Sequence, residues 1–286
     1  MRDDGSASFA LGLVGAGIQA SLTPAMQERE GRASGLSLTY RLIDTGELGL
    51  GVQDLAQVLA WAQRLGFDGL NITHPFKQAV VPLLDDLSPD AADLGAVNTV
   101  LFRDGRLLGR NTDWSGYSRA FQQVLGDAVH DRVVLLGAGG AGAAVGYGLL
   151  AQGAAHVGVL DTDAERAHGC VVRLAKRFGD ERVGVVDDLT AALDDAQGLV
   201  NATPIGMHGH PGMPVPADVV DPGRWVSDVV YFPLETDLVA LARERGCRVL
   251  PGGGMAVHQA AGAFELFTGH TADAGRMSRH FAELTG

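Results

Sequence analysis

Short apolar runs alternate with longer segments of helical period along most of this chain. The apolar runs are bounded by Gly, Asn or Asp, as is typical of buried strands, while the longer segments carry apolar residues every three to four positions. The predicted strands are 9–14, 69–72, 97–102, 106–109, 132–136, 156–160, 183–186, 199–202, 225–230 and 248–250. This alternation predicts βαβ units and a largely parallel sheet, with 97–102 and 106–109 forming a hairpin.

The predicted helices are recognised by their spacing and by their ends. Segment 53–65 carries its apolar residues on one face, and Gly66 follows at the position where a left-handed residue ends many helices. A short helix is expected over 76–84, beginning at Pro75 and broken near Pro82. Further helices are expected over 115–126 and 255–267.

The order of these elements predicts a two-domain α/β fold. A second series of strands starts near residue 132 in the pattern of a doubly wound, Rossmann-type parallel sheet. Because a Rossmann half is complete without the last helix, that helix is expected to return to the first domain. The predicted domains are 9–114 plus 255–286, an N-terminal α/β domain, and 115–254, the Rossmann domain.

Composition narrows the class of protein. The chain has 286 residues, 46% of them hydrophobic, and no run approaches the ~20 apolar residues of a membrane helix, so a membrane protein is not expected. The net charge of −12 repels a phosphate backbone, which argues against a nucleic-acid partner. Cys170 and Cys247 form no disulfide framework and are expected to be packed thiols. Residues 1–6 resemble no secretory signal and predict a frayed tail, so we expect a cytoplasmic protein.

A glycine motif carries the strongest chemical signal. Gly137, Gly139 and Gly142 spell G-x-G-x-x-G directly after an apolar strand and directly before a helix. In that context the glycines allow a tight turn and the close approach of backbone N–H groups to a pyrophosphate. A turn that serves close packing alone is the alternative.

An acidic residue after the next strand favours NAD as the cofactor. Asp161 lies 24 positions after Gly137, near the spacing of the acid that binds the adenosine ribose, and its charge repels the 2′-phosphate of NADP. Asp163 adds a second negative charge, and Arg166 is the nearby counterargument. In another interpretation Thr162 caps the next helix with Glu165 in a capping box; both interpretations can hold together.

Two further groups stand where α/β proteins bind ligands. Ser21 and Thr23 precede Pro24 at the start of a predicted helix, with Thr23 as the expected N-cap, so their hydroxyls could hold an anion or only cap the helix. Lys77 and Asp113 lie near strand ends, where an acid/base pair is possible although surface residues are more common.

Other chemistry has little support. His208 and His210 could offer two imidazoles, but no third ligand is in view, so no metal is expected and a mobile loop is the better interpretation. Ser115 lacks the G-x-S-x-G setting of a nucleophile elbow, so hydrolase chemistry is not indicated.

Taken together, these motifs resemble the shikimate dehydrogenase family over nearly the whole chain, and within it the NAD-dependent quinate/shikimate dehydrogenases. The resemblance rests on the motifs Ser21-Leu22-Thr23-Pro24, Asn71-Ile72-Thr73-His74-Pro75-Phe76-Lys77, Gly95-Ala96-Val97-Asn98-Thr99, Gly109-Arg110-Asn111-Thr112-Asp113, Gly137–Gly142, Asn201-Ala202-Thr203-Pro204, Asp228-Val229-Val230-Tyr231 and Met255-Ala256-Val257-His258-Gln259-Ala260.

The resemblance implies a role for each of these motifs. It implies a first domain that binds substrate and carries out catalysis, a cleft beside the Rossmann domain, and Lys77 and Asp113 as the catalytic pair. The implied substrate ligands are Ser21 and Thr23 for the carboxylate, Thr73, Asn98 and Gln259 for ring hydroxyls, and Tyr231 lining the cleft. The expected cofactor-binding residues are Gly137, Ala138, Gly139, Gly140, Ala141, Gly142, Asp161, Asn201, Thr203, Pro204 and Gly254.

Departures from the NADP-dependent biosynthetic branch suggest quinate and NAD. That branch usually has serine at the position of Thr23 and Asn-Arg-Thr where this chain has Leu160-Asp161-Thr162, and His258 also resembles the quinate branch. We therefore expect NAD-dependent oxidation of quinate or shikimate, faster at high pH, by a monomer or homodimer. The alternatives are the NADP-dependent biosynthetic enzyme, an aminoshikimate or aminoquinate dehydrogenase, and a dinucleotide-binding regulator without chemistry.

Overall fold

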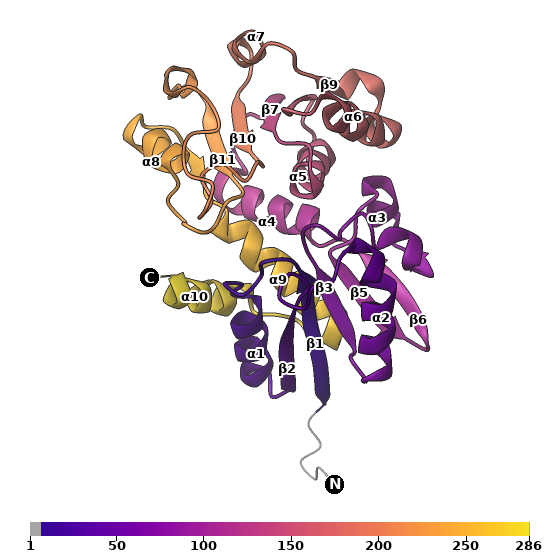
Figure 1. Ribbon diagram of the computed structural model, residues 1–286. Helices are drawn as coiled ribbons and strands as arrows, with labels where there is room; N and C mark the ends of the chain where they lie inside the picture. Colours follow the sequence, from indigo (N-terminus) through magenta and orange to yellow (C-terminus); the bar gives the residue numbers. More distant parts are fainter. Residues whose placement is uncertain (1–6, 286) are drawn as a thin grey trace. The chain divides into compact units, whose positions relative to one another are not determined.

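The computed structural model describes residues 7–285, and the tail predicted over residues 1–6 lies outside them. The described chain forms two compact units (Figure 1). Unit 1 contains the residues up to Thr112 and those from Gln259 onward, and unit 2 is Asp113–His258. Each unit has its own six-stranded sheet with helices packed on it, so the predicted α/β fold class is confirmed.

The sheet of unit 1 is mixed. Its strands are β1 (Ser8–Gly15), β2 (Ser37–Asp44), β3 (Gly69–Ile72), β4 (Asp86–Leu87), β5 (Thr99–Arg103) and β6 (Arg106–Arg110). They lie in the order β2-β1-β3-β5-β6-β4, in which β1 is parallel to both neighbours and β5 is antiparallel to β3 and β6. The β5–β6 pair confirms the predicted hairpin. The edge strand β2 was not among the predicted strands.

Helices cover both faces of this sheet. The helices of unit 1 are α1 (Thr23–Ala33), α2 (Leu55–Arg64) after the short 3₁₀ turn η1 (Val52–Asp54), α3 (Pro89–Leu94), the 3₁₀ turn η2 (Val81–Leu83) and α10 (Ala274–Thr285), while α9 (Gly253–Thr268) crosses the division between the units. On β1, Leu11 and Leu13 pack with Phe267 of α9, whereas Val14 packs with Leu55 of α2. Successive side chains of a strand point to opposite faces, so β1 contributes to both cores.

The helix predicted over 76–84 is wrong. The segment is a series of turns that ends in η2, and its backbone bonds run mostly over three residues, as from Phe76 N–H to the Thr73 carbonyl. Pro75 and Pro82 cannot donate backbone hydrogen bonds, and the few residues between them are too short a stretch to sustain an α-helix.

Unit 2 is a doubly wound parallel sheet. Its strands are β7 (Arg132–Leu136), β8 (His156–Leu160), β9 (Val183–Val185), β10 (Gly198–Asn201), β11 (Trp225–Asp228) and β12 (Val249–Leu250). Its helices are α4 (Asp113–Leu125), α5 (Gly140–Ala151), α6 (Ala164–Phe178), α7 (Leu189–Asp194) and α8 (Asp237–Glu244), with 3₁₀ turns η3 (Asp180–Arg182) and η4 (Ala217–Val219). The order β12-β11-β10-β7-β8-β9 is the Rossmann order, whose direction reverses between β7 and β10.

Other properties of the described chain agree with this architecture. Cys170 and Cys247 are both free and buried, as predicted for packed thiols. Within residues 7–285 no helix combines the length and the apolar character needed to span a membrane.

Candidate active site

The glycine-rich loop lies at the switch point of the unit 2 sheet, between the carboxyl ends of β7 and β10. Gly137 has a φ of +93°, and a Cβ atom there would come within 2.8 Å of the Ala202 carbonyl oxygen after β10. A Cβ atom on Gly142 would collide with the carbonyl oxygen of Gly137. Both positions therefore require glycine, and the loop can turn directly from β7 into α5.

The start of α5 fits the pyrophosphate of a dinucleotide. Gly139 is the N-cap residue and offers no side chain to cap the helix. A Cβ atom on Gly139 would meet nothing within 4 Å in the described structure, so open space lies in front of the first turn. A helix N-terminus with exposed backbone N–H groups favours an anion, so the residues Gly137, Ala138, Gly139, Gly140, Ala141 and Gly142 suit the predicted cofactor.

Asp161 contacts this loop directly. Its carboxylate accepts hydrogen bonds from the Ala138 N–H at 2.7 Å, from the Asp163 N–H at 2.9 Å, and from Arg166 Nη2 at 2.8 Å. Burial alone would raise the pKa of Asp161, but the bonds from Arg166, Asp163 and Ala138 outweigh it and lower the pKa to about 2. Asp161 is therefore a fixed negative charge at the end of β8.

The capping residue of α6 differs from the one expected. Asp163, not Thr162, is the N-cap, and its carboxylate accepts the Arg166 N–H at 3.1 Å. The predicted N-cap, Thr162, is therefore wrong by one position, and the predicted capping box of Thr162 and Glu165 does not form. Asp161 remains outside the helix, where its carboxylate serves the loop rather than the cap.

Asn201 organises the loop after β10 from inside the protein. It is fully buried, and its side-chain amide donates to the Ile205 carbonyl and to Asp228 Oδ1, both at 3.0 Å. Its Oδ1 accepts the Thr203 hydroxyl at 2.6 Å. The side chain of Asn201 thus shapes the loop that carries Thr203 and Pro204 next to Gly137, instead of facing a ligand itself.

Asp228 joins the ends of two strands to a helix. It accepts the Val230 N–H at 2.9 Å and the Thr236 hydroxyl at 2.7 Å, and Thr236 in turn caps α8 by accepting the Val239 N–H. Burial raises the pKa of Asp228 even though these bonds act to lower it.

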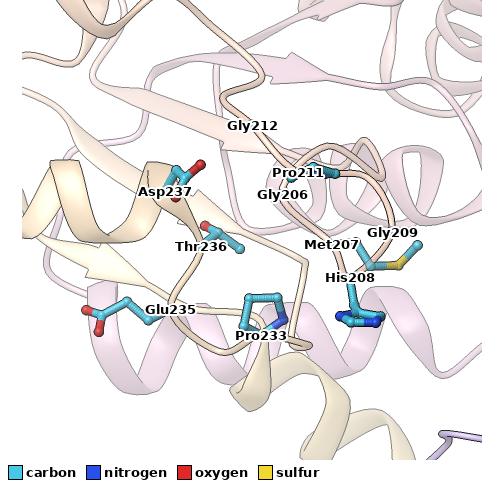
Figure 2. Close-up of a pocket in the computed structure, with 10 residues that line it drawn as sticks. All are labelled: Gly206, Met207, His208, Gly209, Pro211, Gly212, Pro233, Glu235, Thr236 and Asp237. Carbon is cyan, nitrogen blue, oxygen red and sulfur yellow. The ribbon is translucent and has the colours of Figure 1, made fainter.

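A cavity of about 510 Å³ lies between the loops that follow β10 and β11 (Figure 2). Its lining includes His208, Glu235 and Asp237, and none of the predicted site residues. The His208 ring packs against Phe232 with 5.7 Å between ring centroids. The two carboxylates disfavour an anionic ligand there, so we do not assign the dinucleotide to this cavity.

Unit 2 also holds three of the remaining predicted residues. Asp113 is buried at the first position of α4. Partial burial and the negative charge of Asp113 together raise the pKa of the Tyr231 phenol, so these two residues lie close enough to interact. Gly254 is in the first turn of α9, where a Cβ atom would press on Ala120 of α4 at 3.1 Å.

In unit 1, Ser21 and Thr23 begin α1 at the carboxyl end of β1. The structure places the N-cap at Leu22 and Thr23 at the first helical position, so Thr23 is not the N-cap that was expected. Leu22 has no hydroxyl, and the Ser21 hydroxyl instead accepts the Thr23 N–H at 3.3 Å. Both hydroxyl residues are half-buried at a helix start whose N-cap residue supplies no side-chain hydrogen bond.

Thr73 and Lys77 follow the carboxyl end of β3, beside that loop. The Thr73 N–H bonds to the Val14 carbonyl at 2.9 Å, and a Cβ atom on Gly15 would collide with the Thr73 side chain. The half-buried Lys77 accepts the Val97 N–H at its carbonyl oxygen, at 2.8 Å. Ser21, Thr73 and Lys77 therefore lie along one edge of the unit 1 sheet.

Asn98 belongs to a buried polar network at the same edge. Its carbonyl accepts the Ile72 N–H at 2.8 Å, and its Oδ1 accepts the Thr112 N–H at 2.8 Å and the Thr99 hydroxyl at 2.9 Å. With 3% of its surface exposed, Asn98 is held in one orientation.

Gln259 lies on α9, and the residues that follow it in this helix contact unit 1 near this edge. The neighbouring Ala260 carbonyl accepts Gln27 Nε2 at 2.8 Å, and a Cβ atom on Gly262, one turn further, would touch the Thr112 side chain at 3.4 Å. Unit 1 therefore brings together Ser21, Thr23, Thr73, Lys77, Asn98 and Gln259, while Asp113 and Tyr231 belong to unit 2.

Several residues that shape these sites had no predicted role, although Asp228 belongs to one of the recognised motifs. Asp44 accepts bonds from the loop before Ser21, Asp228 fixes the loop after β10, and Gly252 packs against the backbone of Val229 and Val230. Two of the three, Asp44 and Asp228, are acidic residues that end a strand, and that position in the sequence could have marked them as candidates. Among residues 7–285, no three His, Cys, Asp or Glu side chains gather where they could hold a metal ion.

A Rossmann unit with this loop and this acid is the nucleotide-binding part of a dinucleotide-dependent enzyme. Comparison with known proteins identifies the family. The family model described as shikimate dehydrogenase substrate binding domain matches residues 13–100, and the one described as shikimate 5'-dehydrogenase C-terminal domain matches residues 252–279.

Relatives and solved structures match nearly the whole chain. A shikimate dehydrogenase (NADP(+)) of Streptomyces avermitilis is 53% identical, covering 98% of this chain and 97% of its own length. A quinate/shikimate dehydrogenase (NAD(+)) of Corynebacterium efficiens is 47% identical, covering 97% of this chain and 99% of its own. The structure of quinate dehydrogenase from Corynebacterium glutamicum in complex with NAD superposes with a TM-score of 0.91 at 46% identity, covering 97% of this chain and 100% of that one.

The chain belongs to the shikimate dehydrogenase family. The predicted resemblance to that family, including its NAD-dependent quinate/shikimate dehydrogenases, is confirmed. It is therefore an oxidoreductase that uses a dinucleotide cofactor.

Proposed function

We propose that the protein oxidises quinate and shikimate at a ring hydroxyl, with NAD as the hydride acceptor. The carrying observation is the Asp161 carboxylate, which is bound to the Ala138 N–H of the glycine-rich loop and is negatively charged at any pH above about 3. A carboxylate there can accept the ribose hydroxyls of NAD and repels the 2′-phosphate of NADP. The likeness to a quinate dehydrogenase in complex with NAD supports the same conclusion.

The proposed substrate ligands come from the edge of the unit 1 sheet described above. Ser21 and Thr23 would receive the substrate carboxylate at the open start of α1, where the helix dipole favours a negative charge. Thr73, Asn98 and Gln259 would bind ring hydroxyls, with Tyr231 of unit 2 lining the pocket. Thr23, where the biosynthetic branch usually has serine, supports quinate as a substrate.

In the proposed reaction the substrate alcohol loses a hydride from carbon and a proton from its hydroxyl group. A dinucleotide held by the glycine-rich loop and Asp161 would supply the acceptor for the hydride, which is the carbinol hydrogen with both electrons of its C–H bond. Lys77, with its amine neutral, accepts the hydroxyl proton as the C=O bond forms, and in the reverse reaction its ammonium returns that proton. We propose that Asp113 orients Lys77 and stabilises the ammonium once it has formed.

A second candidate is the NADP-dependent reduction of 3-dehydroshikimate. Arg166 favours it, because its guanidinium is half exposed and lies 2.8 Å from Asp161, so it could turn toward a 2′-phosphate. The Streptomyces avermitilis relative, named as NADP-dependent, supports the same candidate.

Initial rates on quinate and shikimate, each with NAD and with NADP, test both candidates. We expect turnover of both substrates with NAD, and kcat/KM at least about tenfold lower with NADP. Turnover of shikimate with NADP alone would contradict the proposal and support the second candidate. No turnover, with NAD still bound in a fluorescence titration, would point to an amino-substituted substrate or to a regulator.

A further inference from the structure

The loop between β1 and α1 determines where Ser21 and Thr23 lie. It runs over residues 16–22, directly after the buried strand β1, and much of it is exposed. Gly17 has a φ of +67°, and a Cβ atom on it would meet nothing within 4 Å. Apart from Ile18, the residues of this loop have little packing, so hydrogen bonds must contribute to fixing its conformation.

One carboxylate accepts hydrogen bonds from three successive residues of this loop. Asp44 ends β2 opposite Gly15, and its side chain reaches over the end of β1. Its Oδ1 accepts the Gly17 N–H at 2.9 Å and the Gly46 N–H at 3.1 Å, while its Oδ2 accepts the Ile18 N–H at 2.8 Å and Gln19 Nε2 at 3.2 Å. Three of these four donors belong to the loop itself.

Asp44 is built to remain a charged acceptor. It is 4% exposed, so its oxygens depend on protein donors. Burial alone would raise the pKa of Asp44, but the bonds from Gly17, Ile18, Gln19 and Gly46 outweigh burial and lower it. Hydrogen bonds to an ionised group are stronger than those between neutral groups, which suits a role in holding backbone.

The constraint passes from Ile18 to Ser21 in one step. The Ser21 N–H bonds to the Ile18 carbonyl at 2.9 Å, and the Ser21 hydroxyl accepts the Thr23 N–H at 3.3 Å. The Ile18 side chain is buried in the core cluster with Leu11, Leu13 and Phe267. The position of Ile18 therefore sets that of Ser21 and the first turn of α1.

We propose that Asp44 is a positioning residue for substrate: by holding Gly17, Ile18 and Gln19 it presents the Ser21 and Thr23 hydroxyls to the substrate carboxylate. This inference rests on the proposed function, in which those hydroxyls bind that carboxylate. Asp44 itself does not touch substrate. Its removal should therefore weaken substrate binding and leave the proton and hydride transfers intact.

Asp44→Asn is the direct test, because it keeps the shape of the side chain while removing the charge and presenting an NH₂ group to backbone donors. We expect KM for quinate and shikimate to rise about tenfold or more, with kcat changed less than threefold and KM for NAD unchanged. Gln19→Ala, which removes one of the four donors, should raise KM for quinate about twofold and is expected to fold normally.

Asp68→Asn is the matched control. Asp68 is also a carboxylate that accepts a backbone N–H, that of Ala10 at 2.8 Å, but this bond lies near the start of β1, at the opposite end from the loop. We expect Asp68→Asn to lower the melting temperature without changing KM for quinate. If Asp44 had a structural role and nothing more, Asp44→Asn would likewise lower the melting temperature without changing KM for quinate.

The outcomes separate this inference from the proposed function. If wild-type protein turns over quinate or shikimate but Asp44→Asn keeps the wild-type KM, or loses kcat and KM for NAD to the same extent, the inference is overturned while the proposed function remains. If Asp44→Asn does not fold, an unchanged KM in Gln19→Ala counts against the inference and a small rise in KM supports it. If wild-type protein turns over neither substrate, both fail together.

Discussion

The choice between NAD and NADP depends on the balance between two side chains, Asp161 and Arg166. The Asp161 carboxylate engages Arg166 through Nε and Nη2, at distances of 2.8 to 3.2 Å. As long as Asp161 is charged, Arg166 is neutralised and a 2′-phosphate meets a carboxylate.

Asp161→Ser should shift the preference toward NADP. We expect KM for NAD to rise about tenfold as the ribose loses its acceptor, and KM for NADP to fall as Arg166 is released to bind the phosphate. Adding Arg166→Ala should remove the gain with NADP. The control is Asp163→Asn, which alters the cap of α6 but leaves Asp161 in place and should keep the cofactor ratio. An unchanged ratio of kcat/KM values in Asp161→Ser would show that cofactor choice lies elsewhere.

The turn from β7 into α5 contains two glycines whose substitution should weaken NAD binding in both cases but lower the melting temperature in only one. Gly142→Ala forces a methyl group onto the Gly137 carbonyl, so we expect a lower melting temperature and loss of NAD binding. Gly139→Ala meets open space at an ordinary negative φ of −71°, so the melting temperature should be kept. NAD should still bind at least about tenfold more weakly, because the added methyl occupies the space proposed for the pyrophosphate.

Differential scanning fluorimetry and a fluorescence titration with NAD check both variants. Gly169→Ala is a useful comparison, because a Cβ atom there meets only Arg173 Nη1, at 3.5 Å, and Gly169 lies within α6 rather than in this loop. If Gly139→Ala bound NAD as tightly as wild type, the pyrophosphate would not lie in front of the first turn of α5.

Buried strands were the elements that could be predicted best. The segments 69–72, 132–136 and 156–160 coincide with β3, β7 and β8, because strands buried between two layers read as short apolar runs. The edge strand β2 exposes Ser37, Thr39 and Arg41, so it shows no such run. Segment 76–84 is apolar enough for a helix, but Pro75 directly before it and Pro82 within it prevent one.

Site residues could be predicted where a local motif carries the chemistry. The spacing of Gly137, Gly139 and Gly142 identified the loop, because its conformation depends on residues within one turn. Asp44 could not be found in this way, because its partners Gly17 and Ile18 lie 27 and 26 positions away in the chain. Asn201 illustrates the converse: its motif was recognised, but only the structure shows that its side chain is buried in the loop.

In the proposed function, each of the two units supplies different residues to the reaction. Unit 1 carries Lys77, the proposed base, and unit 2 carries Asp161 and the glycine-rich loop, the proposed cofactor site. A proton-transfer residue and a cofactor-binding residue respond differently to pH, so a pH profile can separate their contributions.

We expect kcat for quinate oxidation to be higher at alkaline pH than at neutral pH, because Lys77 accepts the hydroxyl proton only as a neutral amine. KM for NAD should stay level over the same range, since the pKa of Asp161 is lowered to about 2 and its carboxylate does not titrate there. Lys77→Met should reduce kcat by about 10²- to 10⁴-fold and abolish the rise, with NAD still binding normally. Gln78→Met, at the exposed neighbouring position, should keep the wild-type profile. A rise in kcat that persists in Lys77→Met would assign the proton to another group, whereas a KM for NAD that follows pH would mean that the cofactor site contains a titrating group besides Asp161.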